Sequence, residues 1–527
     1  MSRTGRHAFL VALGILLSRL AGVVRQRVFN HYFGLSSVAS AFAQAIRIPN
    51  FLQNLFGEGV LSASFIPVYA RLLAEGAEED AGRVAGAVGA ILGVTTALLT
   101  LVGVAATPLL IDVIAPGFQG DQRQLTIRLV RILFPGVGLL VMSAWCLGIL
   151  NSHGRFLLSY TAPVIWNVVM IATLVAFGGQ FEDMLAITLA WGSVAGSALQ
   201  FGVQLPVILL LARGLRLRLL TRSPQVRTVL RNFAPVFVSR GVVQISAYVD
   251  SLLASLLPEG AVAALLNAQS LTLLPVSLFG MSISAAELPA MSSVLGSGKD
   301  VNDQLRERLN AGLRRMAFFI VPSAMALLAF GDVITGALFQ SGRFGHADSV
   351  YLWGILAGSA VGLLASTMGR LYASTYYALR DTRTPLRYAV LRVALTTALG
   401  YLSALPLPRW MGIEPRWGVA GLTASAGVAG WVEFVLLRRT LNRRIGSTGL
   451  PASLTARLWV SAGFAAAAAW AVKLAMGQRD PILLAAAVLT PYGLLYFAAA
   501  ALLRVHESAE LFERLRQAGR RRDRLPH

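Results

Sequence analysis

Two arginines, Arg19 and Arg25, lie inside the first long apolar run of this 527-residue chain, between Ala8 and Phe29. A guanidinium group keeps its proton in proteins, and placing it in hydrocarbon costs at least ~2.5–3.5 kcal/mol. Each charge must therefore face a cavity lined by water or protein rather than lipid. A cationic cavity inside a membrane is suited to an anion, which arginine binds through forked, charge-assisted hydrogen bonds.

Further polar residues in the first two apolar runs extend this candidate anion-binding site. Ser18 lies in the first run, and Arg47, Asn50 and Glu58 lie in the second. A carboxylate there would orient an arginine or reduce the positive charge of the empty cavity. Arg27 is closer to the end of the first run, and we interpret it as a side chain that reaches the lipid headgroups.

The elements that must position these residues are membrane-spanning helices. The chain is 56% hydrophobic and 13% charged, whereas soluble domains are roughly 25% charged. Apolar runs of about 20 residues, long enough to cross a ~30 Å hydrocarbon core, recur along it, without the short alternating segments of a β-barrel. We expect an all-α integral membrane protein with about 14 transmembrane helices. The predicted spans are 8–29, 38–70, 84–111, 125–150, 157–178, 184–212, 230–257, 261–293, 310–334, 349–378, 386–406, 417–437, 452–475 and 481–503.

The formal net charge of +21 is distributed unevenly along this pattern of spans. Lys and Arg concentrate in every second loop and in the tail, which predicts that both termini are cytoplasmic. The loops on the other side carry few basic residues, among them Arg343, Arg409, Lys473 and Arg479. The basic loops lack the interleaved aromatic residues of a nucleic-acid site, so we interpret them as orientation signals and contacts with anionic lipids.

Motifs for enzyme chemistry are not evident in this sequence. There is no GxxxxGK[ST] loop for ATP, no HExxH motif and no cysteine–histidine cluster that would hold a metal. The single cysteine, Cys146, excludes an internal disulfide. We therefore expect a protein that is not an enzyme and has no cofactor, with transport coupled to the membrane potential or a monovalent cation.

Short motifs recur in the two halves of the chain. Ser18-Arg19 is matched by Ser239-Arg240, and Leu55-Phe56-Gly57 is matched by Leu278-Phe279-Gly280. The repeat predicts two six-helix lobes that enter the membrane in the same direction, with the substrate path at their interface. The expected divisions are an N-lobe (1–212), a basic cytoplasmic linker (213–229), a C-lobe (230–440), two appended spans (441–503) and a basic cytoplasmic tail (504–527).

Prolines and glycines in these spans predict two local features, broken helices and close helix packing. Prolines in corresponding spans of the two halves predict broken helices near a binding site, at Pro49, Pro67, Pro275 and Pro289. Glycines at four- and three-residue intervals predict close helix packing, at Gly82, Gly86, Gly89 and Gly93.

Several ordered motifs resemble the MurJ/MviN lipid II flippases. They are SRLAGVVRQRVFNHYFG and AFAQAIRIPNFLQNLFGEGVLSASFIPVYA near the start, then APGF, GILNSHGRF, LFQSGRF and YALRDTRTP. The resemblance implies the fold of the multidrug/oligosaccharidyl-lipid/polysaccharide exporter superfamily in the bacterial inner membrane. It also implies export of undecaprenyl-pyrophosphate-linked disaccharide-pentapeptide, the precursor of peptidoglycan, with membrane lipids and cell-wall synthesis proteins as further partners. The family's first-helix serine and arginines match Ser18, Arg19 and Arg25, and its second-helix glutamate matches Glu58.

The chain departs from the family pattern at several positions. Residues that are usually charged correspond to Ser40, Gln53, Asn54 and Ser270. Asp250 matches the carboxylate of a sodium site known in some members, but the eleventh-helix positions of that site are Thr396 and Gly400. These departures leave two alternatives to a lipid II flippase. One is a non-transporting scaffold of the cell-wall machinery, and the other is an exporter of a different lipid-linked glycan or amphiphile.

Overall fold

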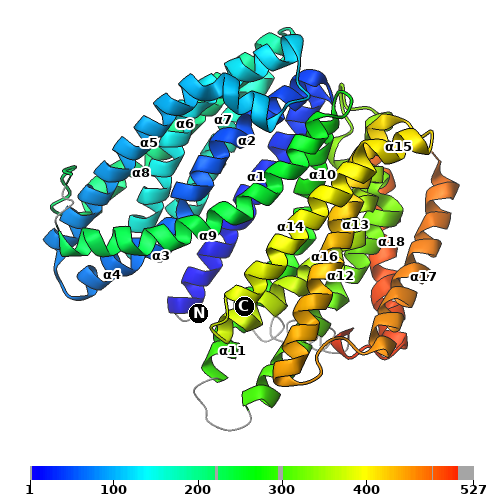
Figure 1. The fold of residues 1–527 in the computed structure, drawn as a ribbon. Coiled ribbons are helices and arrows are strands. Elements are labelled where there is room, and N and C mark those ends of the chain that lie inside the picture. The colour runs from blue at the N-terminus through cyan, green and yellow to red at the C-terminus, as the bar shows by residue number, and fades with distance from the viewer. Residues whose placement is uncertain (1–2, 220–222, 295–300, 478, 509–527) are drawn as a thin grey trace, which may run out of the picture. The chain divides into compact units, whose positions relative to one another are not determined.

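The computed structural model describes residues 3–219, 223–294, 301–477 and 479–508, and these residues are almost entirely helical (Figure 1). Among them, β structure is limited to one isolated bridge between Ser341 and Phe344. Each predicted span coincides with one helix or a set of consecutive helices. Within these described ranges, eleven helical segments are long and apolar enough to cross a membrane. The all-α membrane fold predicted from the sequence is thus confirmed.

The described residues form two compact units, and unit 1 comprises those up to Ala263 together with Ser341–Phe344. Its helices pack around α6, which contacts α2, α5 and α8, while α1 packs on α7. They are α1 (Arg3–Phe33), α2 (Ser37–Phe56), α3 (Glu58–Ser64), α4 (Ile66–Ala74), α5 (Glu78–Ile114), α6 (Gly120–Ser152), α7 (Phe156–Phe177), α8 (Glu182–Leu211) and α9 (Pro224–Ser255).

Unit 2 holds the remaining described residues, in which α13 and α16 form the central pair. The two appended spans, α17 and α18, pack against each other and against α12 (Figure 1). Its elements are α10 (Ala261–Pro275), η1 (Val276–Met281), α11 (Ser282–Val294), α12 (Val301–Phe339), α13 (His346–Ala378), α14 (Arg383–Ala404), α15 (Pro406–Trp410), η2 (Pro415–Trp417), α16 (Gly418–Ile445), α17 (Ala452–Met476) and α18 (Pro481–Leu502).

The boundary between the units falls after α9. This helix packs on α2, α3 and α5, so its contacts group it with the first eight helices. The repeat instead places the boundary between the lobes near residue 230, and that division of the chain stays a prediction.

The second predicted span is broken, although not at its first proline. Pro49 lies within the continuous helix α2, and the chain leaves helical geometry at Gly57 (φ −86°, ψ −150°). A Cβ at Gly57 would lie 2.2 Å from the carbonyl oxygen of Gln53, so only glycine fits there. In the eighth span, Pro275 ends α10 and a single π-helical stretch follows. Such stretches are frequent at functional sites.

The glycine face of α5 packs partly on the segment that follows α8 and partly, at Gly89, on the Trp145 ring of α6. Cβ atoms added at Gly82 and Gly86 would lie 1.9 and 2.2 Å from the carbonyl oxygens of Arg213 and Arg216. A Cβ at Gly93 would have nothing within 4 Å. Gly82 and Gly86 therefore let an extended backbone approach the helix, whereas Gly89 makes the close helix–helix contact that the sequence predicts.

The contrast between Gly86 and Gly93 predicts opposite effects of a glycine-to-alanine substitution at these two positions. Gly86→Ala should lower the free energy of unfolding by about 1–3 kcal/mol, because the contacting atom is backbone and must shift. Gly93→Ala should be neutral or stabilising by up to about 1 kcal/mol, because alanine favours the helix and meets no atom. Thermal unfolding of the purified variants in detergent measures both. Equal destabilisation at the two positions would contradict the packing described here.

The short segment Ser341–Phe344, between α12 and α13, packs within unit 1. The backbone N–H of Arg343 donates to the carbonyl of His31 (2.9 Å), and its guanidinium contacts Glu182 (Nη1 to Oε2, 2.6 Å). Gly342 has φ +54°, and a Cβ there would lie 2.3 Å from the His31 carbonyl oxygen. Glycine thus allows both the left-handed backbone and the close approach.

Candidate functional site

Arg25 of α1 has an aromatic partner and, among the described residues, no ion-pair partner. Its guanidinium carbon lies 4.8 Å from the ring centroid of Trp166 on α7, and the arginine is half-buried. The indole N–H of Trp166 donates to the backbone oxygen and the hydroxyl of Ser193 on α8, both at 3.2 Å, which fixes the ring. No ion pair within the described part of the chain involves Arg25. Its charge is therefore positioned, and no carboxylate among the described side chains pairs with it.

Ser18 and Arg19 lie nearer the N-terminus on the same helix. Ser18 is half-buried and Arg19 is exposed. Six residues separate Arg19 from Arg25, which places them roughly 9 Å apart along the helix axis. The structure therefore keeps Arg19 on the same element as Arg25 but does not include it in the contact with Trp166.

Arg47 of α2 lies beside a tyrosine and a carboxylate of α9. Its guanidinium carbon is 5.9 Å from the ring centroid of Tyr248, whose hydroxyl donates to the Arg47 carbonyl at 2.6 Å. Phe51 packs edge-on against the same tyrosine, with centroids 5.3 Å apart. Arg47 also interacts electrostatically with Asp250. Arg47, unlike Arg25, therefore has a carboxylate of unit 1 in its electrostatic surroundings.

The two remaining site residues lie further along the same stretch. Asn50 is half-buried on α2, one turn after Arg47. Glu58 begins α3 directly after the break at Gly57, and its side chain lies outside the described residues. The side chain of Arg240, a possible partner for Asp250, also lies outside them.

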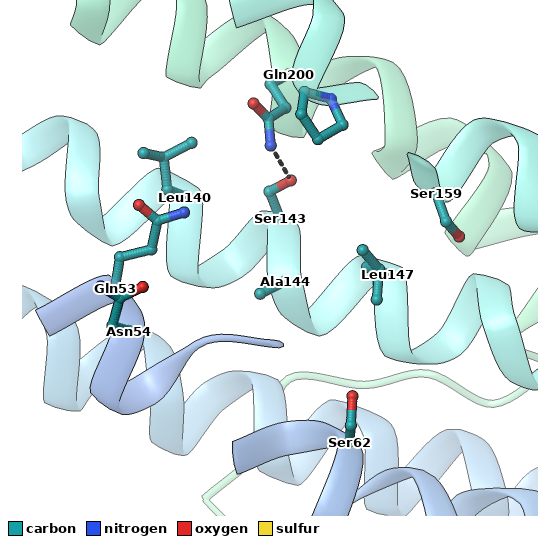
Figure 2. Close-up of a pocket in the computed structure, with 10 residues that line it drawn as sticks. Gln53, Asn54, Ser62, Leu140, Ser143, Ala144, Leu147, Ser159 and Gln200 are labelled. Carbon is teal, nitrogen blue, oxygen red and sulfur yellow. Dashed lines mark hydrogen bonds between the residues drawn. The ribbon is translucent and has the colours of Figure 1, made fainter. Parts of the chain in front are cut away.

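A cavity of ≈ 500 Å³ opens among α2, α3, α6, α7 and α8 (Figure 2). Its lining carries amides and hydroxyls but no charged group: Gln53, Asn54, Ser62, Leu140, Ser143, Ala144, Leu147, Ser159, Pro163 and Gln200. We call it the amide cavity. Because it is neutral, it can hydrogen-bond hydroxyl and amide groups of a ligand, but it cannot neutralise a phosphate.

One wall of the amide cavity is held by hydrogen bonds between α6 and α8. Gln200 and Gln204 both donate through their side-chain amides to the hydroxyl oxygen of Ser143, at 3.0 and 2.6 Å (Figure 2 draws the first). Sequence reasoning identified Gln53 and Asn54 only as departures from a family pattern and missed Ser143, Ser159 and Gln200. The sequence feature that could have identified this wall of the cavity is the pair of glutamines, Gln200 and Gln204, four residues apart on one face of an apolar span.

Comparison with solved structures identifies proteins that share this fold. An inward closed structure of the lipid II flippase MurJ superposes with a TM-score of 0.77 at 21% identity, covering 94% of this chain and 98% of that one. An inward-facing multidrug resistance MATE family transporter of the MOP superfamily gives 0.66 at 18% identity, covering 79% and 95%. At these identities the likeness shows the fold alone. This chain therefore has the same fold as these two proteins.

Sequence comparison then gives the family. The family model for lipid II flippase MurJ matches residues 29–503. The lipid II flippase MurJ of Burkholderia cenocepacia is 30% identical over 445 residues, 83% of this chain and 84% of that protein. The probable lipid II flippase MurJ of Bdellovibrio bacteriovorus is 32% identical, over 83% and 82%. This chain belongs to the MurJ lipid II flippase family.

Proposed function

We propose that this protein moves lipid II from the inner to the outer leaflet of the bacterial cytoplasmic membrane by alternating access. The family match over residues 29–503 supports the substrate. The observation that carries the proposal is Arg25, a half-buried cation in a membrane helix whose charge no described carboxylate balances. The free-energy cost of placing such a charge in a membrane is high unless an anionic ligand binds it.

The two polar parts of lipid II differ in chemistry, and unit 1 offers a different surface for each. A pyrophosphate carries about two negative charges, which arginines bind through forked hydrogen bonds. Arg25, with Arg19 on the same helix, would supply these contacts, and Arg47 would contribute if the substrate displaced it from Asp250. The amide cavity would hydrogen-bond the uncharged sugar and peptide groups, since its lining is neutral.

The membrane potential can supply the driving force for this export. Moving an anion outward across an inside-negative membrane is favourable by ~2.3 kcal/mol per charge per 100 mV. A site that releases its anion on the outer side could therefore bias export without ATP.

We expect both termini and the most basic loops to be cytoplasmic. Two ion pairs join residues outside the predicted spans, Glu78 with Arg213 in unit 1 and Asp381 with Arg444 in unit 2. Asp381 also accepts hydrogen bonds from Thr384, and these bonds with Arg444 lower the pKa of its carboxyl to about 2. In each pair the two partners come from loops predicted to lie on the same side.

Reporter fusions test this topology directly. Fusions after Arg222, Arg383 and Arg443 should be cytoplasmic, and fusions near Asp183 and Glu414 should be external. Arg222 itself lies outside the described residues. An external signal after Arg222 would contradict the arrangement, because that loop is the most strongly basic.

Asp250 provides a prediction about coupling. Since it interacts with Arg47, and since Thr396 and Gly400 offer few ligands, we expect transport to be independent of sodium. Asp250→Asn should reduce transport equally with and without sodium. Export into vesicles at varied sodium and constant potential measures this. A steep sodium dependence that Asp250→Ala removes would overturn the expectation.

Complementation tests the proposed function as a whole. Expression of this chain should restore growth to a strain depleted of its lipid II flippase, and lipid II should then become accessible on the outer leaflet. Folded protein at normal abundance that restores neither would contradict the proposal.

A second candidate is a non-transporting scaffold of the cell-wall machinery. The neutral residues Gln53, Asn54 and Ser270, at positions that the resemblance gives as charged, favour it. A scaffold would correct wall defects equally well with Arg25 or with alanine at that position. A flippase requires the arginine.

A further inference from the structure

A second polar cavity, of ≈ 310 Å³, lies within unit 2 and apart from the site described above. It is formed where α12 and α17 end and where α13 and α18 begin. Its lining residues are Asp332, Val333, Gly336, Gln340, His346, Lys473, Leu474, Gly477, Arg479, Pro481 and Leu484. We call it the α17–α18 pocket. In the topology proposed above, it lies at the outer surface of the membrane.

The inner wall of this pocket is a nearly buried ion pair. Lys473 Nζ lies 2.6 Å from Asp332 Oδ2, and the two side chains are 17% and 11% exposed. The ammonium group also lies near two indole rings, 4.4 Å from the centroid of Trp470 and 5.3 Å from that of Trp353. This ion pair therefore gives the pocket a polar inner wall, and its two formal charges cancel.

A kink in the backbone of α12 places Asp332 at this inner wall. Phe330, two residues earlier, leaves helical geometry (φ −131°, ψ 23°) and produces a kink. The indole N–H of Trp353 donates to the carbonyl of Leu328 at 2.8 Å, which satisfies one of the backbone groups near the kink. The direction of the last turns of α12 is thus set by the kink at Phe330 and by the hydrogen bond from Trp353.

The outer rim of the pocket adds a cation and an apolar surface. Arg479, in the turn between α17 and α18, is exposed and forms none of the ion pairs found in the described residues. With the charges of Asp332 and Lys473 cancelled, Arg479 gives the pocket a net charge of +1 before any contribution from His346. Leu474 lines the same pocket and is 72% exposed, and Leu483, next to the lining residue Leu484, is 63% exposed.

We propose that the α17–α18 pocket binds the headgroup of an anionic phospholipid. A phosphodiester carries one negative charge, which matches the net charge of the lining, and Arg479 can bind its two free oxygens in a forked contact. Gln340 and His346 offer hydrogen bonds to headgroup hydroxyls, and the acyl chains lie along the exposed leucines of α17 and α18. Phosphatidylglycerol has this combination of one charge, hydroxyl groups and acyl chains. The site is independent of the flippase activity proposed above.

Lipid retention provides the test. The full-length protein is reconstituted in nanodiscs of phosphatidylglycerol and phosphatidylcholine, extracted into mild detergent, and examined for bound lipid by native mass spectrometry. We expect preferential retention of phosphatidylglycerol. Arg479→Ala should reduce that retention about fivefold, the effect of one basic side chain near an anionic headgroup.

The matched control is Arg409→Ala, an exposed arginine of α15 that does not line the pocket. It should retain phosphatidylglycerol as the wild type does, and both variants should unfold at the wild-type temperature because both arginines are exposed. Equal retention in the Arg479 variant, or equal loss in the Arg409 variant, overturns the proposal. Complete displacement of the lipid by millimolar inorganic phosphate would show a site for a free anion and would also overturn it.

Discussion

Arg25→Ala should abolish export of lipid II while the protein stays inserted in the membrane at normal abundance. The guanidinium lies over the Trp166 ring and has no carboxylate partner in the described structure, so its removal breaks no ion pair there. The cation–π contact is worth about 0.5–2 kcal/mol, so the loss of stability should be small. The loss of a pyrophosphate contact, in contrast, acts directly on substrate binding. Accessibility of lipid II on the outer leaflet, with immunoblots for abundance, measures the two effects separately.

Three further variants define the role of the charge. Arg25→Lys should restore activity only in part, because an ammonium group cannot form the forked contact. Arg19→Ala should also abolish export, whereas Arg27→Ala should be tolerated because we interpret Arg27 as an anchor at the headgroups. Full export by the double Arg19/Arg25 alanine variant at normal abundance would rule out an anion site on α1.

Asp332→Ala should destabilise the protein more than any other single substitution considered for unit 2. It leaves the Lys473 ammonium nearly buried without its carboxylate, and breaking a buried pair costs about 3–5 kcal/mol. Asp112→Ala is the matched comparison, since it breaks an ion pair with Arg123 in which the aspartate is half exposed. That solvent-exposed pair should contribute far less to stability than the pair of Asp332 and Lys473. Thermal unfolding of the purified proteins measures both changes.

A double variant separates the charge effect from simple loss of packing. Asp332→Leu combined with Lys473→Met replaces both charged groups with apolar side chains, so it should recover most of the stability lost in Asp332→Ala. If the double variant were as unstable as the single one, the ion pair would not be the cause.

The helices could be predicted from the sequence because a bilayer imposes one simple requirement. Every segment that crosses it must be apolar for about 20 residues and must satisfy its own backbone hydrogen bonds. The local breaks were harder to predict. Pro49 predicts a break but lies within a continuous helix, whereas the break occurs at Gly57, where the lack of a Cβ lets the backbone lie close to the Gln53 carbonyl. That collision depends on the local backbone and is not visible in residue type.

The residues of the candidate site also differ in whether they could be predicted from the sequence. Arg25 could be identified because a charge in an apolar run is an energetic anomaly that the sequence itself displays. Its partner Trp166, and the contact between Tyr248 and Arg47, could not be predicted because they depend on how distant helices pack. Lys473 shows the limit most clearly. The sequence assigned it only to an outer loop, while its carboxylate partner lies 141 residues away.

The position of Arg25 over Trp166 has a consequence for spectroscopy. Indole emission responds to nearby charge, so Trp166 is a built-in optical reporter at 4.8 Å from the proposed anion contact. A ligand that draws the guanidinium away from the ring would change the emission of this tryptophan while the other eight act as background. The difference spectrum between wild type and Trp166→Phe would then follow binding in real time, without a label on either the protein or the lipid.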